Sequence, residues 1–115
     1  MKPVVQFRIR IYRDESIALG PGKVRLLEAI TASGSISAAA RELGMSYRRA
    51  WQLVEEMNRA LVAPAVVTAT GGANGGGAAL TPTGQVLVTT YRAMEASARQ
   101  AAAAEIETLT GLLAP

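Results

Sequence analysis

The chain has 115 residues, of which 50% are hydrophobic, and this length suits one modest domain with a real core rather than two domains of ordinary size. It contains no cysteine and no histidine, which excludes disulfides, thiol nucleophiles, a Ser-His-Asp triad and zinc-finger ligation. The net charge of +3 is unevenly placed, because residues 1–60 hold ten Lys and Arg against six Asp and Glu, while residues 61–115 hold two against three. The N-terminal half is therefore the candidate for a polyanionic partner.

The sequence carries neither a recognisable secretory signal nor a membrane span. The N-terminus has no continuous apolar core and no small-residue cleavage site. The long uncharged stretch 60–91 is interrupted by six glycines and two prolines, which excludes a transmembrane helix. We expect a cytoplasmic protein with no membrane partner.

Residues 5–11 alternate between apolar and polar side chains, which predicts a half-buried β-strand. The polar side of this strand carries Arg8 and Arg10. Residues 14–22 follow as a turn-rich connection. The apolar side consists of Val5, Phe7, Ile9 and Ile11.

Three helices are expected next. The first runs from Lys23 to Ser33 and ends at Gly34, a residue suited to the left-handed conformation after a helix. A short second helix is capped by Ser35 or Ser37 and ends at Gly44. It places Ala39, Ala40 and Leu43 in the core.

The third helix, residues 46–61, begins at Ser46, another capping residue, and combines an apolar stripe with a polar face. The opposite face carries Arg48, Gln52, Glu55 and Arg59, while Arg49 and Trp51 lie on the flanks. The stripe is Ala50, Leu53, Val54, Met57 and Leu61.

Glycines dominate the stretch "TATGGANGGGAAL" from Thr68 to Leu80. No lysine followed by Ser or Thr comes after a GxxxxG pattern, and Leu80 occupies the position of the last glycine of a GxGxxG fingerprint, so neither nucleotide motif is present. Strands at 65–70 and 78–80 flank the glycines, which predicts a hairpin whose tip approaches a partner closely. The alternative is a disordered loop without a contact role.

Thr81 and Pro82 begin the last predicted helix, which reaches about Leu113. Its apolar residues step by four and three, with a shift of one residue near Ala102, and a helix of this length leaves a stripe that its own domain cannot cover. We therefore expect a homodimer, as opposed to packing onto the chain's own core. The dimerisation residues expected from this stripe are Leu87, Tyr91, Met94, Ala98, Ala102, Ile106, Leu109 and Leu113.

The segment "SISAAARELGMSYRRAWQLV" carries a helix-turn-helix pattern. Counted from Ile36, the small residue Ala40 is fifth and Gly44 is ninth, as two closely crossing helices require, and apolar residues follow at the remaining core positions. On this reading residues 46–61 form the recognition helix, which places its first turns in the major groove of DNA. The expected contact residues on this helix are Ser46, Tyr47, Arg48, Arg49 and Gln52.

The segments "ALGPGKVRLLEAITASGSISAAARELGMSYRRAWQLVEEMN" and "TGGANGGGAALTPTG" together resemble the N-terminal winged helix of the molybdate-responsive ModE regulators, which are LysR-like. The resemblance covers about residues 18–91. It implies recognition roles for Tyr47, Arg48 and Arg49, dimerisation through the helix after Thr81, and DNA proximity for the glycine-rich wing. The wing residues concerned are Thr70, Gly71, Gly72, Asn74, Gly75 and Gly76.

ModE-type regulators continue into a molybdate-binding half, whereas this sequence stops at Pro115, so no cofactor is expected. The fold class expected is mostly α with a small β-sheet, a winged helix-turn-helix at 1–81 followed by a long dimerisation helix at 82–115. The expected function is that of a regulator, not an enzyme, binding a palindromic double-stranded DNA operator as a homodimer, with molybdenum-related genes as candidates. Arg8 and Arg10 would add phosphate contacts if residues 5–11 pair with the wing hairpin. The competing interpretation is a winged-helix assembly module that binds no specific DNA.

Overall fold

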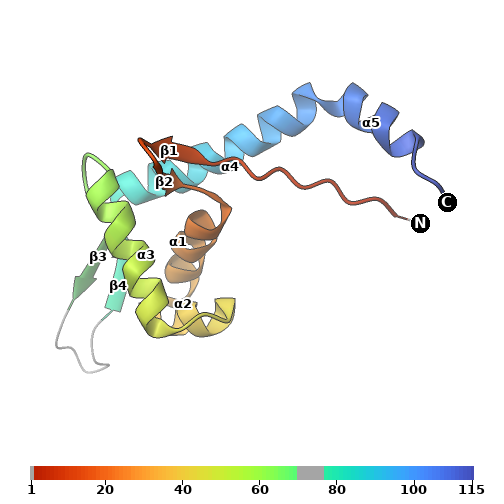
Figure 1. Cartoon of the computed structure of the whole chain (residues 1–115). Coiled ribbons are helices and arrows are strands. Elements are labelled where there is room, and N and C mark those ends of the chain that lie inside the picture. The colour runs from red at the N-terminus through yellow and green to blue at the C-terminus, as the bar shows by residue number, and fades with distance from the viewer. Residues whose placement is uncertain (1, 70–76) are drawn as a thin grey trace.

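The fold was analysed in a computed structural model, which describes residues 2–69 and 77–115. A helical body carries a short β-hairpin at each side, and a long helical segment leaves this body toward the C-terminus (Figure 1). The elements are β1 (Ile11–Arg13), β2 (Ser16–Leu19), α1 (Pro21–Ser33), α2 (Ile36–Leu43), α3 (Tyr47–Ala60), β3 (Val66–Ala69), β4 (Gly77–Leu80), α4 (Pro82–Ala101) and α5 (Ala103–Gly111).

The core lies between the first three helices and the hairpin of β3 and β4. Leu26, Leu27 and Ile30 of α1 are fully buried, and the small residues Ala39 and Ala40 of α2 let that helix approach them closely. The predicted stripe of α3 supplies the third side of the core. Four of its residues are buried, namely Ala50, Leu53, Val54 and Met57.

The predicted glycine stops after the first two helices and the predicted serine caps are confirmed, whereas α1 begins at Pro21, two residues before the predicted Lys23. Gly34 and Gly44 adopt left-handed backbone conformations, with φ of 73° and 69°. Ser35, rather than Ser37, caps α2 by accepting a hydrogen bond from the Ala38 amide, and Ser46 caps α3 by accepting one from the Arg49 amide, each at 3.0 Å. The Gly44 conformation and the Ser46 cap together fix the turn between α2 and α3.

The strand predicted over residues 5–11 is wrong. Residues 2–10 form an extended segment outside any strand, and β1 begins only at Ile11 and pairs with β2 inside the predicted turn-rich connection. The alternation nevertheless reports burial correctly, since Val5, Phe7 and Ile9 are half-buried while the residues between them are exposed. This N-terminal arm lies beside α4, because the Tyr91 hydroxyl donates to the Ile9 carbonyl at 2.6 Å and the Phe7 ring lies 5.1 Å from the Arg99 guanidinium.

The two hairpins form separate sheets. β1 pairs only with β2 and β3 only with β4, so the arm and β1 do not extend the β3–β4 hairpin within the described residues. β3 and β4 pair antiparallel from Val66 opposite Leu80 to Ala69 opposite Gly77. The Ala78 amide donates to the Gly34 carbonyl at 2.9 Å, which fastens this hairpin to the end of α1. The body is a winged helix-turn-helix, as predicted.

The expected C-terminal helix is present in two parts. Ala102 departs from helical geometry, with φ of −95° and ψ of 8°, and the axis bends between α4 and α5 (Figure 1). The radius of gyration is 17.0 Å, whereas a compact chain of this length would have about 13 Å. This excess reflects the extension of α4 and α5 beyond the body. Among the described residues, no helix combines the length and apolarity that crossing a membrane requires.

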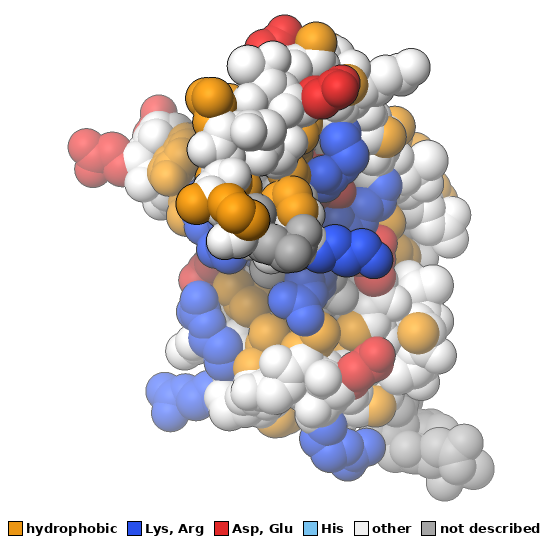
Figure 2. All heavy atoms as spheres, turned by 90° about the vertical axis from the view of Figure 1, so that its right-hand side faces the viewer, with side chains coloured by type: hydrophobic (Ala, Val, Ile, Leu, Met, Phe, Trp, Pro, Cys, Tyr) orange, Lys and Arg blue, Asp and Glu red, His pale blue; other side chains and the backbone are white. Residues whose placement is uncertain are grey.

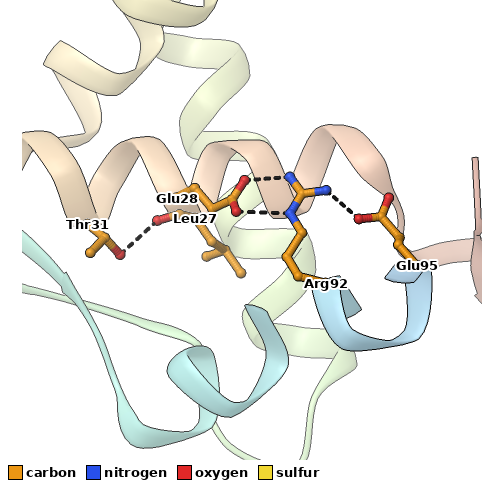
Figure 3. Close-up of polar contacts among 5 residues, drawn as sticks. All are labelled: Leu27, Glu28, Thr31, Arg92 and Glu95. Carbon is orange, nitrogen blue, oxygen red and sulfur yellow. Dashed lines mark hydrogen bonds and ion pairs between the residues drawn. The ribbon is translucent and has the colours of Figure 1, made fainter. Parts of the chain in front are cut away.

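An ion-pair cluster joins α4 to α1 (Figure 3). The Arg92 guanidinium donates to both carboxylate oxygens of Glu28, at 2.9 and 2.5 Å, and to Glu95 at 2.6 Å. This hydrogen bonding lowers the pKa of Glu28 and raises that of Arg92. The three residues therefore hold the first half of α4 in a defined orientation on the body.

Replacing Gly84 by alanine is expected to destabilise the fold. A Cβ atom at this position would lie 2.3 Å from the Ala65 carbonyl oxygen, whereas one at Gly22, which also follows a helix-starting proline, meets nothing within 4 Å. Overpacking of this kind typically costs about 1–3 kcal/mol. Urea denaturation should show a loss for Gly84→Ala and none for Gly22→Ala. Equal stability of the two variants would contradict the close approach.

Arg92→Met should lower the free energy of unfolding at neutral pH by about 1 kcal/mol, because both ion pairs are partly exposed. The folded-state pKa of Glu28 lies below its ordinary value of 4.5, so the carboxylate contributes stability above the unfolded pKa and loses that contribution as the pH falls through the lowered folded pKa. Denaturant titrations from pH 7 to pH 3 should therefore show the difference from wild type narrowing in acid. Arg41→Met, which removes an arginine without an ion pair in the described structure, should show no such convergence.

Candidate nucleic-acid interface

The first turn of α3 forms the centre of the candidate interface. Tyr47, Arg48, Arg49 and Gln52 are all exposed, while the buried stripe of the same helix anchors them to the core. Ser46 is also exposed, but its hydroxyl oxygen is engaged as the helix cap. A rigid helix end thus presents two guanidinium groups and an amide to solvent, a combination suited to phosphates and base edges.

The two aromatic residues of α3 pack against each other. The rings of Tyr47 and Trp51 meet edge to face, with centroids 6.2 Å apart. Tyr47 stays 54% exposed, whereas Trp51 is half-buried against the core. The Tyr47 hydroxyl therefore lies on the same exposed end of the helix as the arginines.

The later turns of α3 carry the carboxylates. Glu55 is exposed on the polar face, and Glu56 lies 3.4 Å from the Lys23 ammonium of α1. Lys23 is itself buried and donates to the Ile17 carbonyl at 2.5 Å. Two arginines at the start of α3, followed by two carboxylates in its third turn, suit entry of only the first turns into a DNA groove.

The predicted wing corresponds to β3, β4 and their connection. The predicted contact residues between Thr70 and Gly76 lie outside the described residues. Gly77, the first residue of β4, packs tightly, since a Cβ there would lie 3.2 Å from the Gly34 carbonyl oxygen. The base of the wing is thus held beside the turn that precedes α2.

Arg8 and Arg10 occupy the N-terminal arm rather than a strand paired with the wing. Both side chains are exposed, and they lie on the side of the arm opposite to Phe7 and Ile9. The structural premise for their role beside the wing is therefore absent. They line a large groove together with residues of α1 and α3.

Sequence reasoning missed Asn58, which joins α3 to the start of the β3–β4 hairpin. Its side-chain oxygen accepts from the Ala65 and Val66 amides at 2.8 and 3.3 Å, and its side-chain nitrogen donates to the Val66 carbonyl at 3.2 Å. Its polar amide beside the buried stripe was the available signal. The bond partners, however, lie beyond the end of the helix and follow no local spacing rule.

The expected dimerisation residues lie in different environments. Tyr91 is 3% exposed and bonds to its own arm, and its burial raises the pKa of its phenol. Leu87, Met94, Ala98, Ala102 and Ile106 are half-buried, while Leu109 and Leu113 are exposed at 63% and 51%. Tyr91 therefore belongs to the packing of the chain itself, and the others leave apolar surface uncovered.

The described residues contain no group of three or more acidic side chains placed to hold a metal ion. The polar groups that do converge at one surface are the arginines, the tyrosine and the glutamine of α3. Their arrangement on a helix that follows a tight glycine turn, beside a β-hairpin wing, defines a winged helix-turn-helix of the regulatory class.

Comparison with known sequences assigns this class to a family. Residues 22–85, more than half of the chain, match the profile of the bacterial regulatory helix-turn-helix proteins of the LysR family. The chain belongs to this family.

Individual relatives are ModE-like, in agreement with the resemblance inferred from the sequence. The chain is 55% identical over 78 residues to the molybdenum-pterin-binding protein MopB of Rhodobacter capsulatus, covering 68% of this chain and 29% of MopB. It is 42% identical over 88 residues to the molybdenum transport protein ModE of Azotobacter vinelandii, covering 76% and 33%. It is 46% identical over 78 residues to the DNA-binding transcriptional dual regulator ModE of Escherichia coli, covering 68% and 30%. The chain thus spans about a third of the length of these relatives.

Proposed function

We propose that the chain is a sequence-specific DNA-binding module of a transcriptional regulator, acting as a homodimer on a palindromic operator. The observation that supports this proposal most directly is the capped start of α3, whose first two turns expose Tyr47, Arg48, Arg49 and Gln52. The helix-turn-helix family of the chain agrees with it. Ser46 would position this turn, and Arg48 and Arg49 would contact base edges or adjacent phosphates.

The wing would contact the DNA backbone through residues 70–76. Thr70, Gly71, Gly72, Asn74, Gly75 and Gly76 carry no charged side chain, so their contribution would come from backbone amides and close approach. The molybdenum-related names of the relatives make genes for molybdenum uptake or use the first candidates for regulation. We propose cytoplasmic localisation and no cofactor or catalytic activity for this chain.

The homodimer would form along α4 and α5. An apolar groove of about 320 Å³ runs beside α4, lined by Val86, Leu87 and Met94 together with Ile11 and Leu61. Further along, Leu109 of α5 is exposed, as are Leu112 and Leu113, which follow the end of that helix. Apolar surface of this extent favours association with a second copy. Two recognition helices related by the twofold axis would then meet half-sites about 34–36 Å apart, or a multiple of that distance.

Arg48→Ala is expected to weaken binding to the selected operator by about 1–3 kcal/mol. The operator is first identified by selecting bound fragments from the source genome, and binding is then measured at two salt concentrations. Relaxed preference at one base pair would indicate base contact, whereas uniform weakening with a smaller salt slope would indicate a phosphate contact.

Arg48→Lys is the matched variant, because it keeps the charge and loses the bidentate geometry. Relative to Arg48→Ala, it should recover the binding affinity if Arg48 contacts a phosphate and should not recover it if Arg48 contacts a base. Unchanged binding by Arg48→Ala would contradict the assignment of α3 as the recognition helix. Retention of no fragment, or uniform salt-sensitive retention of all fragments by the wild type, would favour the assembly module instead.

Leu109→Arg should disrupt the homodimer without unfolding the protomer, because the side chain is already 63% exposed in the single chain. Sedimentation equilibrium would show a shift from dimer toward monomer, with an unchanged circular dichroism spectrum. Ala104→Arg provides the control, since it places the same charge on an exposed residue about 140° around the helix. Equal dimerisation of the two variants would refute the participation of this face.

A further inference from the structure

A basic groove of about 1210 Å³ lies between the N-terminal arm, the β1–β2 hairpin, the start of α1 and one side of α3. Eight of the twelve Lys and Arg residues of the chain line it, against three of the nine Asp and Glu residues, so it carries five net positive charges while the whole chain carries three. Figure 2 shows Lys and Arg side chains gathered around the hollow on this face of the molecule.

Seven of these eight side chains form no ion pair within the described residues. Lys23 is the exception, since it bonds to the Ile17 carbonyl and pairs with Glu56. By contrast, the guanidinium groups of Arg13 and Arg25 form neither an ion pair nor a hydrogen bond in the described structure, and the same holds for Arg59. Like charges held together without compensation repel one another, and an anionic partner would relieve this repulsion.

The groove is continuous with the candidate interface. Arg49 lines its rim and also belongs to the first turn of α3, while Arg59 lines it from the last turn of the same helix. The start of α1 adds a weaker positive potential, because Gly20 offers no capping side chain and the first turn contains no acidic residue. A DNA backbone that extends from α3 along the groove would thus lie beside positively charged side chains.

We infer that the basic groove binds the phosphate backbone of duplex DNA beyond the base pairs that the first turn of α3 contacts. This inference rests on the proposed function. An acidic protein partner would also supply anions but would need exposed apolar anchors. Two apolar side chains at the groove are covered, since Leu53 is 8% exposed and the Phe7 ring lies beneath the Arg99 guanidinium, 5.1 Å from it, while Ile17 is 40% exposed.

The test compares a short duplex that contains one half-site with a longer duplex that embeds the same half-site in unrelated sequence. Wild type should bind the longer duplex more tightly and with a steeper salt dependence. Arg13→Ala and Arg25→Ala should each reduce the salt slope for the longer duplex by about one and leave affinity for the short duplex unchanged. Both residues are exposed, so these variants should fold, as thermal melting would verify.

Lys2→Ala is the matched control, because it removes the same charge from an exposed residue that does not line the groove. If the two arginine variants behave like Lys2→Ala on the longer duplex, the inference is overturned while sequence-specific binding stands. Absence of any sequence preference by the wild type on either duplex would instead overturn the proposed function. A last measurement adds polyglutamate as a competitor to the complexes with the longer duplex. If polyglutamate displaces the duplex from wild type but not from the arginine variants, the occupant of the groove is an acidic polypeptide and the inference is overturned.

Discussion

The structure depends on the segment Pro64–Val66, where α3, the β3–β4 hairpin and α4 meet. The Pro64 carbonyl accepts from the Thr81 hydroxyl at 2.6 Å, and the Ala65 carbonyl accepts from the Thr81 amide at 2.9 Å. Asn58 binds the same segment from the α3 side. Gly84 then brings the first turn of α4 onto the Ala65 backbone, at a distance that leaves no room for a Cβ atom. Because buried backbone groups must be paired, these bonds fix three elements relative to one another at a single point.

This junction gives a physical reason why α3 and α4 keep a fixed relative orientation within the chain. α4 begins at the junction through the Thr81 cap, whose hydroxyl also accepts from the Gly84 amide at 3.1 Å. Two turns further on, the Arg92 cluster holds it against α1 at Glu28. Two separated attachments determine the direction of a helix, whereas one would permit rotation. The spacing between two recognition helices in a dimer would therefore be set by packing within each protomer as well as by the contact between them.

Features governed by neighbouring residues could be predicted from the sequence. Gly34, Gly44, Ser46 and the α3 stripe specify helix ends and a buried face through local geometry, and all are confirmed. The N-terminal arm shows where this reasoning fails. Alternation of apolar and polar residues with a period of two indicates that one side of a segment is covered, but it does not identify the element that covers it. The Val5 and Ile9 carbonyls accept hydrogen bonds from α4, more than eighty residues away in the chain, so the neighbour of the arm is a helix rather than a strand. The alternation was read correctly as half-burial and wrongly as β-pairing.

The basic groove could be predicted only in part. Seven of its eight Lys and Arg residues lie in the N-terminal half, and three of them stand within residues 8–13. They come from the arm, the β1–β2 hairpin, α1 and α3, however, and the sequence does not show that these elements share one face with Arg99 of α4. Only the fold brings these residues to one face while placing Glu105 and Glu107 of α5 outside the groove. Electrostatic potential near a surface depends on the separation of charges in space and is screened over about 10 Å at ordinary salt. A modest overall charge is thus compatible with a strongly positive surface, provided that the fold separates the two signs.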